Sequence, residues 1–144
     1  MAGKTHSKWM TVNYNSQLIT CSIDSIDGIG VNFDTVEVTT LCNQIKERLI
    51  GHGDVSISAS GPFNDTATTG AHNVIEPLNG DPDGATLVIS IGSGAAPTTG
   101  DARFTVTNLG VDNYMVAGSV AGAVTASWTF TPRQGATAEW GTIP

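Results

Sequence analysis

The sequence predicts a mainly β protein: a single-domain sandwich or barrel of about eight strands, with one short flanking helix and long loops. Most of the chain alternates apolar and polar residues with a period of two, which is typical of strands that bury one face. Ser and Thr fill most of the polar positions, and they suit a pleated surface better than a helix. The 17 Gly residues lie mostly between the alternating segments, where turns are expected.

The clearest strand candidate is residues 123–132, with the sequence AVTASWTFTP. Its apolar side chains share one face, and Thr and Ser fill the other: the apolar set is Val124, Ala126, Trp128 and Phe130. The alternation predicts one buried face and one face that is polar but uncharged. Further strands are predicted at residues 9–12, 18–23, 35–38, 55–60, 86–91, 104–107 and 114–120.

Residues 41–50 carry the helical pattern of the chain. Leu41, Ile45 and Leu49 recur at every fourth position, which places them on one side of a helix. A Thr at residue 39 or 40 can cap its start, and Gly51 suits its end. A helix of this length is marginal alone, so we expect Ile45 and Leu49 to be buried against a sheet.

Three Gly-rich stretches, at residues 24–34, 61–84 and 92–101, are predicted to be irregular loops. The first carries apolar Ile26, Ile29, Val31 and Phe33, and the second carries Phe63. Apolar side chains of this size are unfavourable in a solvated loop. We therefore expect a partner to cover them.

Length and charge limit the classes of function. The 144 residues suit one domain spanning 1–144, and 6 basic against 13 acidic residues give a net charge of -7. Scattered basic residues on an acidic chain argue against nucleic-acid binding, which depends on Lys and Arg. No apolar stretch approaches the roughly 20 residues of a membrane helix, and the N-terminus does not resemble a secretion signal. We expect a protein made in the cytoplasm, with Cys21 and Cys42 as small buried hydrophobes.

The sequence predicts no enzyme, no cofactor and no metal site. The three histidines, His6, His52 and His72, stand apart from other ligands at zinc spacing. The segment Gly28-Ile29-Gly30 lacks the third Gly of a dinucleotide loop. Residues 81–84, DPDG, begin like a calcium loop but lack its later ligands, so a turn is expected.

The segment that contains the predicted helix also carries a family resemblance. The phrase DTVEVTT (34–40), a short charged piece, and GHGDVSISASGPFND (51–65) occur in this order. Together they resemble the tail tube (major tail) proteins of long-tailed bacteriophages. The later phrase EPLNGDPDGATLVISIG (76–92) and the closing Ala-x-Trp-x-Phe of residues 126–130 fit the same family.

The resemblance implies a β-sandwich or barrel with one helix, whose hexameric rings stack into a tube through which the genome leaves. It implies a virion protein of the tail, synthesised in the host cytoplasm, that contacts copies of itself and other tail proteins, such as a terminator and baseplate or tip components. Genome DNA would pass through without specific binding, and no membrane is involved. Tube lumens of the family are commonly acidic.

Two sets of residues are candidates for these roles. The subunit interface is expected to use the apolar loop residues, which are Ile26, Ile29, Val31, Phe33 and Phe63. The lumen is expected to receive acidic side chains from Asp24, Asp27, Asp34 and Glu37.

Two other classes of protein share parts of this pattern. A capsid decoration or head-attachment protein of a phage would have the same composition, but would form trimers or isolated knobs. A carbohydrate-binding β-sandwich would show aromatic residues exposed on one strand face. Trp128 lies on an apolar face instead, so sugar binding ranks lower.

Overall fold

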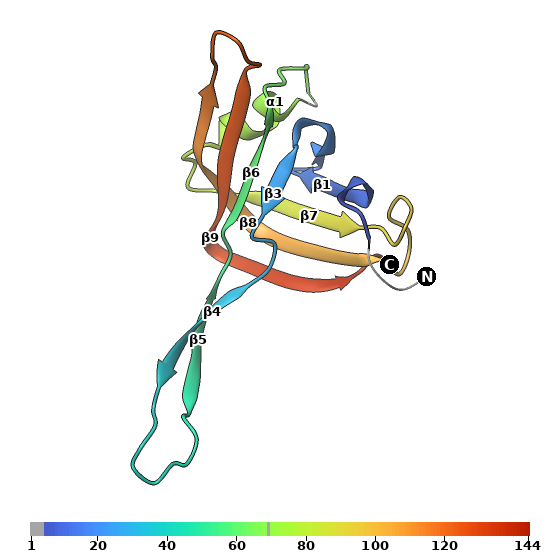
Figure 1. Ribbon diagram of the computed structural model, residues 1–144. Helices are drawn as coiled ribbons and strands as arrows, with labels where there is room; N and C mark the ends of the chain where they lie inside the picture. The colour runs from blue at the N-terminus through green and yellow to red at the C-terminus, as the bar shows by residue number, and fades with distance from the viewer. Residues whose placement is uncertain (1–4, 69) are drawn as a thin grey trace.

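A computed structural model describes residues 5–68 and 70–144 of the chain. Over these residues it has nine strands: β1 (Met10–Tyr14), β2 (Gln17–Leu18), β3 (Ser25–Asp27), β4 (Asn32–Glu37), β5 (Arg48–Asp54), β6 (Ile57–Pro62), β7 (Ala85–Ile91), β8 (Ala102–Ala117) and β9 (Thr125–Thr142). Seven of them form a sheet in the order β2-β1-β7-β8-β9-β6-β3, with antiparallel pairing throughout, and β4 and β5 form a separate ribbon (Figure 1). The predicted mainly β fold is confirmed.

The long hairpin of β8 and β9 bends and so supplies strands to two layers. The first half of β8 pairs with β7 and with the end of β9, as in Phe104 opposite Trp140. The second half of β8 pairs with the start of β9, which in turn pairs with β6. Register shifts beside Asn108 and Asn113, both with positive φ, mark the bulges that allow the bend. The sequence predicted two strands here because it does not reveal that one strand continues through a bulge.

The core lies between the inner faces of the two layers. Its largest fully buried side chains come from both of them, among them Tyr14, Ile57, Leu87, Ile89, Phe104, Leu109 and Phe130. Tyr14 and Phe130 have ring centroids 4.9 Å apart. The predicted alternation is confirmed at Ala126, Trp128 and Phe130, which are buried, whereas Thr125 and Ser127 are exposed. The prediction of Val124 on the same buried face is wrong, since it is exposed beyond the covered part of the sheet.

The helix predicted at residues 41–50 is wrong. These residues form the end of the β4–β5 ribbon, and Ile45 and Leu49 are 80% and 60% exposed. The ribbon projects away from the body (Figure 1), so no sheet surface lies under the apolar stripe. A short helix needs such a surface, and without one the chain continues the strand pairing of Val36 with Leu49.

The helix of the described chain, α1 (Ala71–Ile75), lies in the stretch predicted to be a loop, and a 3-10 turn, η3 (Glu76–Leu78), follows it. Val74 and Ile75 are buried in the core, which explains why this Gly-rich connection carries apolar residues. The stretch 24–34 was likewise predicted to be irregular, yet it contains β3 and the beginning of β4.

Two smaller expectations are also corrected. Cys21 and Cys42 are both exposed, not buried. Most of the strand predicted at residues 18–23 is a 3-10 turn, η2 (Thr20–Ser22). The Thr20 hydroxyl accepts from the Val12 amide at 2.9 Å. The Thr20 side chain thus takes the place of the backbone carbonyl that a longer strand would pair with β1. In the described ranges, none of the helices is long and apolar enough to cross a membrane.

Candidate assembly interface

The most exposed part of the molecule is the β4–β5 ribbon with its connecting residues 38–47, called the arm below (Figure 1). Every residue of β4 and of β5 is exposed. Because side chains alternate along a strand, this means that both faces of the ribbon are uncovered. A lone two-stranded ribbon is marginally stable in water.

The arm nevertheless carries a dense set of large apolar side chains. Those that are exposed are Phe33, Val36, Val38, Leu41, Ile45, Leu49 and Ile50. Val36 lies opposite Leu49 on one face, and Ile50 lies opposite Thr35 on the other. Exposed apolar surface of this extent is typical of a protein–protein contact.

Polar contacts link charged and polar side chains near the end of the arm. Lys46 Nζ lies 3.9 Å from Glu37 Oε1, and Asn43 Nδ2 donates to Glu47 Oε1 at 3.0 Å. The Glu47 amide donates to the Thr39 hydroxyl at 2.9 Å. These contacts give the exposed turn a defined shape although it buries no core.

The predicted interface residues gather at the base of the arm, with different exposure. Ile26, Ile29 and Val31 are half-buried and pack against the core. Phe33 is 54% exposed, and its ring lies so close to Gly53 that a Cβ there would approach Phe33 Cε1 to 2.9 Å. A pocket of about 220 Å³ lies beside these residues, with β8 and β9 forming its far wall.

Phe63 lies apart from that set, at the end of β6. It is half-buried against the core, and its ring centroid lies 5.0 Å from that of His72. The Nδ1 atom of His72 lies 3.0 Å from the Tyr114 hydroxyl oxygen. Phe33 is therefore the predicted interface residue that leaves the most surface free.

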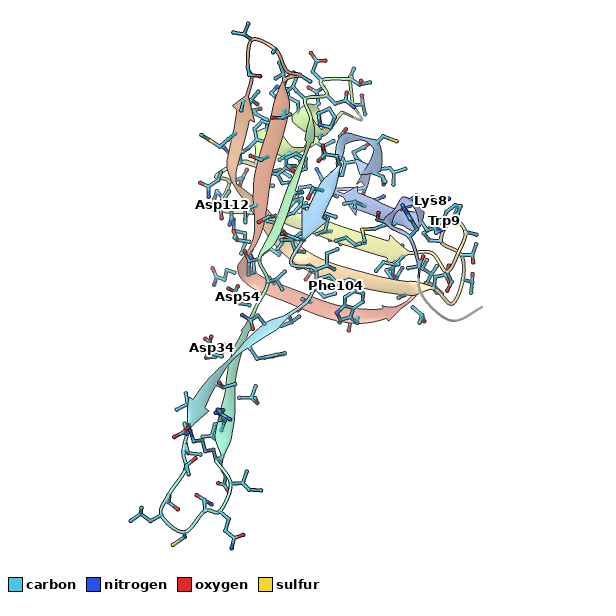
Figure 2. The ribbon with its side chains drawn as sticks, viewed as in Figure 1. Lys8, Trp9, Asp34, Asp54, Phe104 and Asp112 are labelled. Atoms are coloured by element: carbon cyan, nitrogen blue, oxygen red, sulfur yellow. The ribbon has the colours of Figure 1, made fainter. Side chains whose placement is uncertain are left out.

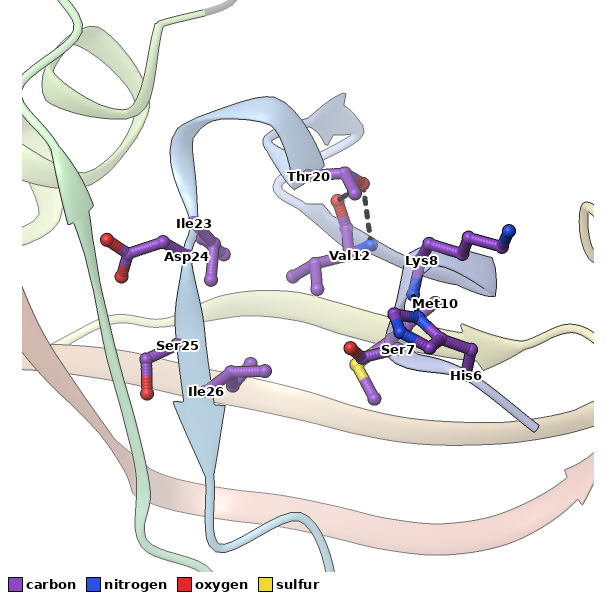
Figure 3. Close-up of a pocket in the computed structure, with 10 residues that line it drawn as sticks. All are labelled: His6, Ser7, Lys8, Met10, Val12, Thr20, Ile23, Asp24, Ser25 and Ile26. Atoms are coloured by element: carbon purple, nitrogen blue, oxygen red, sulfur yellow. Dashed lines mark hydrogen bonds between the residues drawn. The ribbon is translucent and has the colours of Figure 1, made fainter. Parts of the chain in front are cut away.

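The structure does not bring the four acidic candidates together. Asp34 and Glu37 lie on the arm, as Figure 2 shows for Asp34. Asp24 lines a groove of about 550 Å³ between β1 and β3, whose walls also include Val12, Ile23 and Ile26 (Figure 3). This groove marks the place where the sheet stays open between its two end regions. Asp27 lies on another surface, described next.

The outer side of β3, β6, β9 and β8 forms a surface rich in hydroxyl groups, called the hydroxyl face below. The strand register places its side chains in rows: one row is Asp27, Ser58, Thr129 and Asp112, and the next is Ser25, Ser60, Ser127 and Met115. An open hollow of about 410 Å³ lies over it. Uncharged hydroxyl groups dominate the surface.

An Arg at the bend of the long hairpin holds the edge of this face. Arg133 Nη2 donates to Asp112 Oδ1 at 3.0 Å and to the Val111 carbonyl at 3.1 Å. Its Nε donates to the Asp81 carbonyl at 2.9 Å. Hydrogen bonds from Arg133 and from the Thr131 hydroxyl lower the pKa of Asp112, so this carboxylate stays charged and paired.

A second uncovered apolar surface was missed in the sequence. It lies at the end of the β8–β9 hairpin, where Met115, Val116, Val120 and Val124 are 48% to 109% exposed. Residues 113–132 contain no Asp, Glu, Lys or Arg, and that uncharged run is the signal that could have revealed it. This surface, called the hairpin end below, lies at the opposite end of the molecule from the arm (Figure 1).

The histidines have local roles. His6 Nδ1 accepts from the Lys8 amide at 3.0 Å, and His52 is exposed on the arm. Among residues 5–68 and 70–144, no group of three or more His, Cys, Asp or Glu side chains is placed to hold a metal ion.

Comparisons with solved structures match nearly the whole chain. A chain from the six-fold symmetrised baseplate of the anti-feeding prophage aligns with a TM-score of 0.73 and 10% identity, over 99% of each chain. A chain from the extended sheath–tube complex of PVC, an extracellular contractile injection system, has a TM-score of 0.71 and 12% identity, over 97% of this chain and 93% of that one.

A third match comes from the tail of an empty gene transfer agent particle, refined with helical and C6 symmetry. It has a TM-score of 0.59 and 21% identity, over 93% of this chain and 98% of that one. No protein-family model and no curated protein matches the sequence. The chain therefore has the fold of tube and tail components of phage-like particles and contractile injection systems, the fold that its resemblance to tail tube proteins implied.

Proposed function

We propose that this chain is a tail tube subunit, whose copies form hexameric rings that stack into the conduit for genome delivery. The observation that carries the proposal is the arm, which exposes apolar side chains on both faces. A ribbon of this kind gains its stability from neighbours. The fold agrees with this role, and two of the similar structures have six-fold or C6 symmetry.

The partners in this proposal are first of all copies of the same chain. Phe33 contacts a neighbouring copy beside the base of the arm, and Ile26, Ile29 and Val31 hold that base in place. Terminator and baseplate proteins meet the last rings of the tube in the virion tail. The role is structural, with no catalytic step.

The hydroxyl face lines the lumen in this proposal. A conduit for DNA needs a wall that does not hold phosphate groups, and Lys and Arg are the side chains that do so. The hydroxyl face offers Ser and Thr with Asp27, and the charge of Arg133 at its edge is already paired with Asp112. Of the acidic candidates, Asp27 is the one on this wall.

Negative-stain microscopy and sedimentation of the purified protein test the proposal. We expect hollow tubes or stacked rings with six-fold end views, and an assembly that grows with protein concentration. Trimers, isolated knobs on a shell, or a protein that stays monomeric at all concentrations would contradict it.

Labelling of a Ser127→Cys variant in a Cys21→Ser, Cys42→Ser background tests the position of the hydroxyl face. In tubes, a small maleimide should still react, because the lumen contains water, whereas a maleimide carrying a long polymer should not. Equal reaction with both reagents would place the face outside. Tight, salt-sensitive binding of duplex DNA by the free subunit would also argue against a passive wall.

A second candidate is a subunit of a single ring at the end of a tail. The likeness to a baseplate chain, with a TM-score of 0.73, favours it. The same micrographs separate the two candidates, because a baseplate subunit should form single rings that do not stack.

A further inference from the structure

Among the described residues, the arm and the hairpin end each expose several large apolar side chains, and they lie at opposite ends of the molecule (Figure 1). One copy therefore cannot cover its own hairpin end with its own arm. A second copy displaced along the long axis can bring its arm to that surface. A head-to-tail contact generates a ring where its rotation closes and an open filament where it does not, and a displacement along the long axis prevents closure.

The apolar side chains of the hairpin end continue the core-facing side of β8 and β9 past Phe63, the last residue that covers it. The Phe63 amide donates to the Val124 carbonyl at 2.9 Å, and Phe63 is half-buried there. Beyond this point Val116 and Val124 are each 48% exposed, and Val120 at the turn is fully exposed. An apolar side chain placed here would continue the existing core.

Charge identifies a second copy as the occupant. The chain carries a net charge of -7, so copies repel one another over most of their surfaces. Residues 35–50 of the arm contain two acidic and two basic residues, Glu37, Glu47, Lys46 and Arg48, and these sum to zero. The hairpin end lies in the run 113–132, which has no charged residue. Asp34 and Asp54 lie nearer the base of the arm. The neutral outer part of the arm, residues 35–50, and the uncharged hairpin end are thus surfaces on which two copies can meet without repulsion.

Contacts within the arm leave its apolar residues free for this use. Glu37 faces Lys46, and Glu47 accepts from Asn43, so these three charged side chains already have partners when the arm meets an apolar surface. Leu41 and Ile45, 106% and 80% exposed, lie between these polar contacts. An isolated charge would oppose burial in such a contact.

We propose that Leu41 and Ile45 at the arm tip of one copy dock on Val116, Val120 and Val124 at the hairpin end of a copy in the next ring. This inference rests on the proposed function, since it specifies how rings stack. It also gives the tube a direction, because every ring offers arms on one side and hairpin ends on the other.

Disulfide trapping with the native Cys42 at the arm tip tests the contact. In a Cys21→Ser background, Val120→Cys places a second thiol at the hairpin end. We expect mild oxidation of assembled tubes to give disulfide-linked chains of more than six subunits, because each copy joins one copy above and one below. Ala96→Cys in the same background puts the thiol on the exposed β7–β8 loop and should give no such chains.

The outcomes separate this inference from the proposed function. Tubes that form normally but give no linked chains with Val120→Cys, or chains that end at six subunits, would overturn the contact between rings and leave the tube role intact. Failure of the unmodified protein to form rings or tubes would overturn the proposed function and this inference with it.

Discussion

The Tyr14 hydroxyl donates to the carbonyl oxygen of Leu109 at 2.6 Å, inside the core. This hydrogen bond joins β1 to the point at which β8 bends, so it links an end region of the sheet to the bend between the layers. Tyr14 is fully buried. The hydroxyl is therefore part of the core that sets the angle between the two layers.

Tyr14→Phe should lower the free energy of unfolding by about 1 to 3 kcal/mol, because the buried Leu109 carbonyl loses this donor. The ring packing against Phe130 is retained, so the fold should persist. Urea unfolding at neutral pH measures the difference. Unchanged stability would show that the carbonyl finds another donor.

The same hydroxyl predicts a loss of stability at alkaline pH. Burial raises the pKa of Tyr14 from 10.0 to about 12, so the folded state keeps its proton where the unfolded state loses it. This contribution, about 2 to 3 kcal/mol, is fully present below pH 10 and is lost as the pH rises toward 12. The stability gap between wild type and Tyr14→Phe should therefore narrow across that window. A constant gap would contradict the assignment.

Asp112→Asn should have a small effect that depends on pH in the opposite sense. Its pKa is lowered in the folded state, so the stabilisation is present above the unfolded pKa of about 4 and is lost as the pH falls. The side chain is 39% exposed, and solvent screening limits the effect to about 1 kcal/mol or less. Acid unfolding of the two proteins should converge at low pH.

Arg133→Met should cost more than Asp112→Asn, about 1 to 3 kcal/mol, because Arg133 also donates to the carbonyl groups of Val111 and Asp81. Met keeps much of the side-chain volume above Gly110. Thermal unfolding of the two variants beside wild type gives the comparison. Equal losses would show that only the ion pair contributes.

Gly28→Ala should disturb the base of the arm. Gly28 has φ +79 in the turn between β3 and β4, and a Cβ there would lie 2.3 Å from the Ser56 carbonyl oxygen. We expect a loss of at least about 1 to 2 kcal/mol and weaker assembly. Gly141→Ala is the matched control, because a Cβ at Gly141 meets nothing within 4 Å. Equal stability and equal assembly of the two variants would show that the chain does not need a glycine at residue 28.

Ile45→Asp separates assembly from folding. The helix predicted from the sequence would have made this substitution unfold the protein, whereas the exposed arm predicts a change in stability within about 0.5 kcal/mol. Tube formation should be lost, because the new charge lies in the proposed contact. Gln44→Asp adds the same charge at the neighbouring exposed residue without removing an apolar side chain. If both variants assemble normally, the arm tip is not in the interface.

Much of the fold could be predicted because a period of two specifies which face of a strand is buried. Trp128 and Phe130 lie where their alternation placed them. The arm could not be predicted in this way, since Leu41, Ile45 and Leu49 have helical spacing but no surface to pack on. Periodicity states which side chains lie together, and only the tertiary arrangement decides whether they are covered.

The candidate interface could likewise be predicted only in part, because the sequence shows which residues are apolar but not which of them the chain itself covers. Phe33 was recognised because a large apolar residue in a Gly-rich stretch needs a partner, and it is exposed on the arm. The neighbouring Ile26 and Ile29 share that pattern but pack on the core of their own chain. Val120 was missed because a single Val among Gly and Ala forms no apolar pattern that predicts a contact. The absence of charged residues around it is nevertheless visible in the sequence.

The path of the chain from the arm into the body has a mechanical consequence. Two residues separate β5 from β6, which continues in nearly the same direction (Figure 1) and pairs with β9 at six positions. A pull on the arm is therefore carried along β6 and loads its ladder with β9 in shear, with the hydrogen bonds sharing the force instead of opening one after another. Tension applied through the arm would reach the longest strand of the subunit without bending a loop.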